Sequence, residues 1–129
     1  MTPQRPIRPQ FTRAASAAMI EQWDYYKEQQ GIELANRWRD AVADTVKSLL
    51  VFTERGARCR LPNKRLRRLR WIPVPHFPYR VFYLFDPDSR ALLVVHLLHN
   101  KRDIADLLME AVSEMDEDVS DPMKGEPGK

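Results

Sequence analysis

The chain has 129 residues, of which 43% are hydrophobic, and this length predicts one domain with a single modest core. No apolar stretch approaches the roughly 18 residues that a membrane helix requires, and residues 1–9 carry arginines and prolines without an apolar segment, so neither a membrane span nor a secretory signal is predicted. Cys59 is the single cysteine, which excludes a disulfide framework and a cysteine metal site. We therefore expect a soluble, cytoplasmic protein without metal or cofactor.

The net charge of +3 conceals an uneven distribution of charge along the chain. Residues 1–108 carry 19 basic and 11 acidic side chains, whereas residues 109–129 carry seven acids and two lysines. Residues 55–70 contain eight basic side chains and no acid. This segment is predicted to attract anionic partners, whether nucleic acid or an acidic protein segment. The alternative is a solvated, mobile loop. These basic residues are Arg55, Arg58, Arg60, Lys64, Arg65, Arg67, Arg68 and Arg70.

The N-terminal part of the chain predicts an arm, a strand and a helix. Residues 1–9 are expected to form a flexible arm, and residues 10–13 a short strand with Phe11 facing inward. Residues 14–30 have apolar side chains at helical spacing, with Thr12 or Ser16 as the cap of the helix.

A second amphipathic helix is predicted over about residues 33–53. Gly31 suits the left-handed conformation that ends the first helix, so the two helices form an antiparallel hairpin. Trp38 and the other aromatic residues of these helices fall at helical spacing, which indicates core positions.

The pattern then changes to the two-residue period of strands. Strands are expected near residues 67–74, 79–86 and 91–98, and their short turns predict antiparallel pairing. The last of these strands is apolar on both faces, so it is expected in the centre of the sheet.

A final helix is expected to begin at Ile104, with Asp103 as its cap, and to end near Met115. The acidic residues 116–129 are expected to be disordered because they can bury little apolar surface. The expected division is therefore an arm over residues 1–9, a domain over residues 10–115 and a tail over residues 116–129.

This order of elements, with Tyr-Arg-Val-Phe-Tyr at residues 79–83 and Leu-His-Asn-Lys-Arg-Asp-Ile at residues 98–104, resembles the RelE/ParE toxins of prokaryotic type II toxin–antitoxin systems. The resemblance covers about residues 10–108 and is greater to the ParE branch. It implies an α+β fold, in which an antiparallel helix hairpin packs on a small, mainly antiparallel sheet of about four strands, followed by a short C-terminal helix.

The resemblance implies one of two activities. RelE-like toxins cut messenger RNA on the ribosome without a metal, whereas ParE-like toxins poison DNA gyrase and carry out no chemistry themselves. In both branches a cognate antitoxin wraps and inactivates the toxin, and the complex of the two proteins can be a higher oligomer.

Arg80 and Arg102 match positions at which RelE-like nucleases carry phosphate-stabilising arginines, and Lys101 could add charge. Such nucleases commonly place a tyrosine or another proton-transfer residue in the final helix, where this chain has Leu108, which cannot exchange protons. His96 and His99 are the remaining candidate bases, although their places in and at the end of a strand also fit a structural role.

The absence of that proton-transfer residue favours the ParE-like activity, which is a gyrase inhibitor neutralised by an antitoxin. The residues expected to bind the target or the antitoxin are Arg80, His99, Lys101, Arg102, Arg65, Arg67 and Arg68. The first alternative is a ribosome-dependent endoribonuclease that uses Arg80, Arg102, Lys101 and His99. The second alternative is a nucleic-acid-binding domain without toxicity, which the absence of a base-stacking motif from the sequence disfavours. A structural role for Arg80, paired with Asp86 or Asp103, is the remaining possibility.

Overall fold

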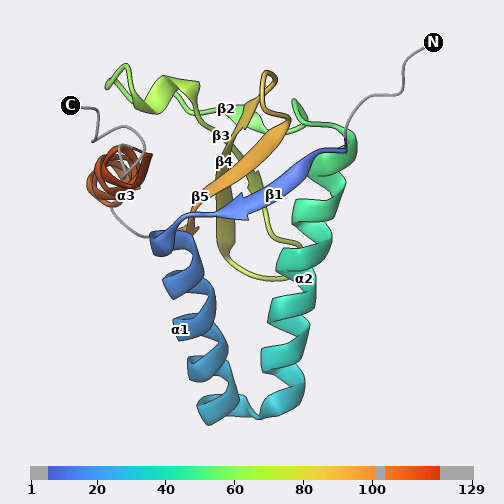
Figure 1. Ribbon diagram of the computed structural model, residues 1–129. Coiled ribbons are helices and arrows are strands. Elements are labelled where there is room, and N and C mark those ends of the chain that lie inside the picture. The colour runs from blue at the N-terminus through green and yellow to red at the C-terminus, as the bar shows by residue number, and fades with distance from the viewer. Residues whose placement is uncertain (1–5, 101–103, 120–129) are drawn as a thin grey trace.

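The computed structural model describes residues 6–100 and 104–119, with side chains described through Glu114. Three helices surround one five-stranded sheet in this part of the chain (Figure 1). The elements are β1 (Arg8–Phe11), α1 (Arg13–Gln30), α2 (Ile32–Val51), β2 (Ala57–Arg58), the 3₁₀ turn η1 (Leu66–Arg68), β3 (Arg70–Pro73), β4 (Tyr79–Asp86), β5 (Ala91–His99) and α3 (Ile104–Val119). The predicted α+β fold is confirmed.

The strands follow the order β1-β5-β4-β3-β2 across the sheet. The three strands that the sequence predicted, β3, β4 and β5, pair as antiparallel neighbours. β5 lies inside the sheet, as its two apolar faces predicted. The sheet has one strand more than the expected four, because β1 adds in parallel to β5 and the two-residue β2 adds to β3. The sheet is therefore mixed at one edge.

The prediction for the first strand was wrong in its position and its inward residue. β1 covers Arg8 and Pro9, which were assigned to the arm, and all four of its residues are exposed, including Phe11. The strand ends early because Thr12 caps α1: its hydroxyl oxygen accepts the Ala15 N–H at 3.0 Å and donates to the Val95 carbonyl at 2.7 Å. Thr12 thereby fixes the start of α1 beside β5.

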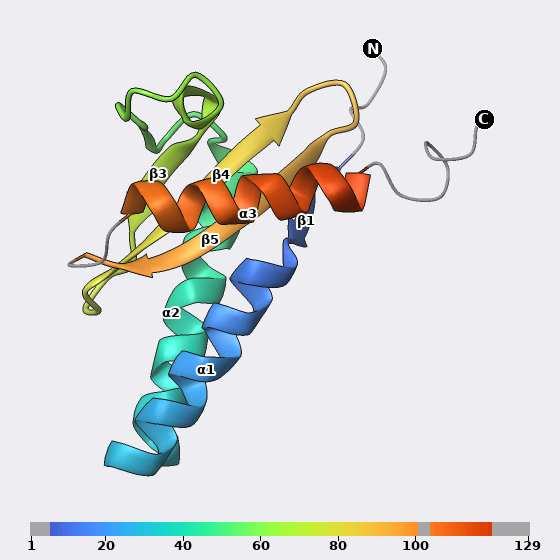
Figure 2. The same ribbon diagram turned by 90° about the vertical axis from the view of Figure 1, so that its left-hand side faces the viewer.

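Two clusters of buried side chains lie on the two faces of the sheet. Trp38, Leu49 and Val81 belong to the cluster between the sheet and the α1–α2 hairpin, and Phe82, Val95 and Leu108 to the cluster between the sheet and α3. Figure 2 shows α3 crossing one face of the sheet, while the hairpin extends beyond the sheet. Helices on both faces explain why β4 and β5 are apolar on both sides.

The hairpin is held by polar contacts of two tryptophans as well as by packing. Trp38 is fully buried, and its indole N–H donates to the Met19 carbonyl at 3.3 Å. The indole N–H of Trp23 donates to the Asn36 side chain, also at 3.3 Å. The prediction that Trp38 is a core residue is confirmed. None of the described helices has the length and apolarity needed to cross a membrane.

The final helix α3 continues to Val119, beyond the end expected near Met115. No proline or glycine occurs between Ile104 and Val119, so the sequence contains no residue that would end the helix earlier. The predicted cap Asp103 and residues 120–129 lie outside the described residues.

Candidate functional site

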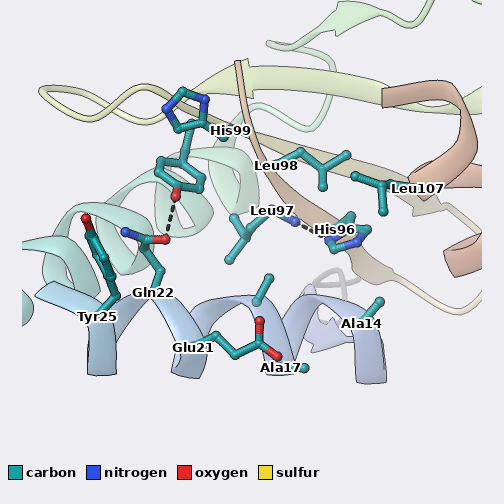
Figure 3. A pocket seen from close by; sticks show the side chains of 12 residues that line it. Ala14, Ala17, Glu21, Gln22, Tyr25, His96, Leu97, Leu98, His99 and Leu107 are labelled. Carbon is teal, nitrogen blue, oxygen red and sulfur yellow. Dashed lines mark hydrogen bonds between the residues drawn. The ribbon is translucent and has the colours of Figure 1, made fainter. Parts of the chain in front are cut away.

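A groove of about 490 Å³ runs between α1 and the end of β5, with Leu107 of α3 at its border (Figure 3). Its lining combines small residues of α1, among them Ala14 and Ala17, with polar and titratable side chains. These polar side chains are Glu21, Gln22, Tyr25, Tyr79, His96 and His99. The lining of the groove therefore combines apolar side chains with hydrogen-bonding groups, as recognition sites commonly do.

The groove follows from the way in which β1 ends. β1 pairs with β5 only as far as Val94, and after Thr12 the chain turns into α1. The last residues of β5 consequently lie beside a helix and have no strand partner on that side within the described part of the chain. The backbone N–H of Leu97 donates instead to the imidazole Nδ1 of His96 at 2.9 Å.

His96 occupies a half-buried position at an irregularity of β5, where the register with β4 shifts between Phe82 and Tyr83. Burial lowers the pKa of His96, and the nearby carboxylates of Glu114 and Glu21 oppose this effect. The Nδ1 atom accepts a hydrogen bond, which requires that nitrogen to be unprotonated. His96 is thus a neutral imidazole with an acceptor turned toward its own backbone.

His99 lies at the end of β5, on the side of the sheet that carries the hairpin. Its ring meets the ring of Tyr79 edge to face, with the centroids 5.1 Å apart. The Tyr79 hydroxyl donates to the side-chain oxygen of Gln22 on α1, as the dashed line in Figure 3 shows. Tyr79 therefore contacts both α1 and His99 within the lining of the groove.

Arg80 lies on the other face of the sheet. It pairs with Leu98, which belongs to the cluster under α3, and directly opposed residues of an antiparallel pair share a face. Its guanidinium carbon stands 4.4 Å from the centroid of the Trp71 ring, a cation–π contact. Arg80 and His99 of the predicted nuclease set are therefore on opposite faces.

The alternative pairing of Arg80 with Asp86 is not found, because the two residues lie near opposite ends of β4. The Asp86 carboxylate accepts hydrogen bonds at 3.0 Å from the Asp88 N–H and the Ser89 hydroxyl. Lys101, Arg102 and Asp103 lie outside the described residues. A common surface for Arg80 and Arg102 stays a prediction.

The three predicted binding arginines around η1 are exposed, and two of them make hydrogen bonds to backbone carbonyls. Arg65 donates to the Val112 carbonyl of α3 at 3.4 Å, and Arg67 to the Pro62 carbonyl at 2.9 Å. Arg68 is exposed beside them. They lie at the β2 edge of the sheet, so the structure does not bring them into the groove.

Leu108 is fully buried in the cluster between α3 and the sheet. No acid or base is therefore present at the position where the RelE-like pattern would place a proton-transfer side chain. Within residues whose side chains are described, no three His, Cys, Asp or Glu side chains gather as metal ligands do.

The sequence reasoning missed Glu21, Gln22, Tyr25 and Tyr79 as members of the groove. On an amphipathic helix, polar residues outside the apolar stripe read as solvent-facing. They could have been identified only if the pairing of β1 with β5 had been predicted first, because this pairing places α1 beside His96.

Comparisons with known proteins identify a matching family model and solved structures of similar fold. The family model described as the ParE toxin of the type II toxin–antitoxin system parDE matches residues 10–104. No curated protein sequence matches the chain. Among solved structures, one from the chromosomal ParDE system of P. aeruginosa is similar, with a TM-score of 0.60 and 18% identity over 73% of this chain and 96% of that one. The toxin–antitoxin complex RelBE2 of Mycobacterium tuberculosis is also similar, with a TM-score of 0.51 and 14% identity over 77% of this chain and 97% of that one.

Proposed function

Because the chain belongs to the family of ParE toxins of type II toxin–antitoxin systems, we propose that it inhibits DNA gyrase in the cytoplasm and that a cognate antitoxin neutralises it. Gyrase inhibition of this kind is stoichiometric binding, so the toxin needs a recognition surface and no proton-transfer group.

The buried Leu108 is the observation that carries the choice of gyrase over messenger RNA. Cleavage of RNA through its 2′-hydroxyl requires a base and an acid beside the scissile phosphate. At the matching place in α3 the chain has an alkyl side chain with no exposed surface. The separation of Arg80 and His99 onto opposite faces supports the same choice, because a general base must be within hydrogen-bond reach of its proton.

The groove between α1 and β5 supports the proposal of an antitoxin partner. It offers a β5 edge without a strand partner among the described residues, beside small side chains that leave space. An extended segment can form main-chain hydrogen bonds along such an edge while its side chains occupy the groove. We assign the antitoxin segment to this groove.

Growth and gyrase assays test the proposed function. Inducing the chain alone in a suitable bacterium should arrest growth, and co-expression of the neighbouring reading frame's product should restore it. Purified protein should inhibit DNA supercoiling by gyrase and should leave ribosome-bound messenger RNA intact.

The variant Arg80→Gln tests the role of a predicted binding residue. Its control is Arg37→Gln, which removes the same charge from an exposed position of α2. Arg80→Gln should reduce toxicity, whereas Arg37→Gln should not. Unchanged growth on induction would refute the toxin assignment, and rapid loss of translated messages without DNA breaks would replace gyrase by the ribosome.

A further inference from the structure

The described surface carries a second site, at the β2 edge of the sheet, that the proposed function does not use. Residues 55–70 contain eight basic side chains and no acid, and we call them the basic segment. In Figures 1 and 2 this part of the chain, from β2 to β3, lies at the end of the molecule opposite the tip of the hairpin. It is therefore separate from the turn between α1 and α2.

The basic side chains of this segment are directed to solvent while its apolar side chains are buried. Cys59, Leu66 and Leu69 are between 1% and 5% exposed and pack under α3. The exposed basic side chains are Arg55, Arg58, Arg60, Lys64, Arg65, Arg67 and Arg68. The charged side chains that the segment presents are thus all cationic.

Among the described residues, no carboxylate pairs with Arg58, Arg60 or Arg67. The ion pair recorded there joins Arg39 to Asp40 in α2, at 3.6 Å. Arg67 and Arg70 donate to neutral backbone carbonyls, Arg67 to Pro62 at 2.9 Å and Arg70 to Gly56 at 2.8 Å. Such bonds orient a guanidinium and leave its charge available to a partner.

Three arginines of the segment surround one hollow. Arg58, Arg60 and Arg67 line an open depression of about 610 Å³, together with Cys59, Leu61 and Pro62. A guanidinium group can bind two phosphate oxygens through its planar fork. The three arginines that line the hollow could therefore contact oxygens of adjacent phosphates.

We propose that the basic segment binds the phosphate backbone of a double-stranded nucleic acid without regard to its base sequence. Residues 55–70 include no aromatic side chain, so they offer no platform on which the bases of a single strand could stack. Two of the segment's three leucines, Leu66 and Leu69, are buried, so the segment presents no exposed large apolar side chain of the kind that anchors protein–protein interfaces. A polar, strongly positive surface is typical of contacts with duplexes.

Salt-dependent binding to a labelled duplex of random sequence tests the proposal, using the purified full chain. Each phosphate contact contributes about 0.9 to the slope of log K against log salt concentration. The triple variant Arg58→Gln, Arg60→Gln and Arg67→Gln should therefore flatten the slope by about 2.7 and weaken binding about tenfold or more at low salt. Duplex DNA and duplex RNA should both bind, since both present paired phosphate backbones.

The matched control is the triple variant Arg37→Gln, Arg39→Gln and Lys47→Gln, which removes the same charge from exposed positions of α2. It should leave the slope within experimental error. If the triple variant folds poorly, the double variant Arg58→Gln and Arg60→Gln replaces it, because this variant keeps the hydrogen bond from Arg67 to Pro62. The double variant should flatten the slope by about 1.8.

Three outcomes would overturn the proposal. Equal losses in the two triple variants would reduce it to an effect of net charge. Polyglutamate binding as tightly as the duplex would assign the segment to an acidic protein partner, and tighter binding of a single strand would exclude duplex recognition. Duplex binding is measured without gyrase, so its failure leaves the proposed function standing.

Discussion

His96 shows how burial decides the charge of a single residue in the groove. Its imidazole is half-buried, accepts the Leu97 N–H through Nδ1 and is near Glu21 of α1 and Glu114 of α3. Desolvation disfavours the imidazolium, whereas the two carboxylates favour it, and the loss of solvent is the larger effect. The result is a neutral group in a polar groove.

The pKa of His96 is expected below the ordinary value of about 6.5. Between that lowered pKa and about 6.5 the unfolded chain binds more protons, so the free energy of unfolding should decrease as pH falls through this window. Titration of the ring signals by NMR checks the pKa, with His96→Gln identifying the signal.

Glu21→Gln should lower the pKa of His96 further, because it removes a carboxylate that stabilises the imidazolium. Glu28→Gln makes the same change at an exposed position of α1 and should have a smaller effect. A His96 midpoint at or above about 6.5 would contradict the structural interpretation.

At the scale of elements, Gly31 joins the two helices of the hairpin as a shared cap. Its N–H donates to the Lys27 carbonyl at 3.0 Å, and its carbonyl accepts the Ala35 N–H at 3.3 Å. Its φ of 101° confirms the expected positive angle, but its ψ of 168° is extended and not left-handed helical. This region of backbone space is accessible almost only to glycine.

Gly31→Ala should lower the free energy of unfolding by about 1–3 kcal/mol through backbone strain, since no atom lies within 4 Å of an added Cβ. Gly31→Asn should not recover this loss, because asparagine tolerates the left-handed helical region and not this one. Urea denaturation measures both changes, and Gln30→Ala, at the exposed neighbouring position, is the control. Full recovery with asparagine would show that the joint is left-handed helical.

At the scale of the whole molecule, the groove exists because three elements that are distant in sequence meet. The hydrogen bond from the Thr12 hydroxyl to the Val95 carbonyl joins residues 83 positions apart and sets α1 beside β5. Leu107 then borders the groove from α3. A change that fills this space should act on partner binding and leave the sheet intact.

Ala17→Trp should fill the groove from an exposed position of α1 and weaken binding of the antitoxin about tenfold or more, or about 1.4 kcal/mol. Calorimetric titration with the purified antitoxin measures the loss. Ser16→Trp adds the same ring at an exposed position that does not line the groove and should bind normally. Equal affinity of the two variants would place the antitoxin elsewhere.

Local patterns were sufficient for most of the helices and strands. The two-residue period predicted β4 at residues 79–86 as found, and helical spacing predicted the burial of Trp38. Both are properties of neighbouring residues, because the side-chain direction in a strand or helix follows from its own backbone period. The positive φ of Gly31 is equally local.

Pairing between distant strands decided the candidate site. Arg80 and His99 read as one basic group in the sequence, yet Arg80 pairs with Leu98 and His99 with Tyr79, so the two side chains leave opposite faces of the sheet. A shift of one residue in this register would have placed them together. Register depends on burial across the whole sheet, and the groove beside His99 depends in turn on the contact of α1 with β5.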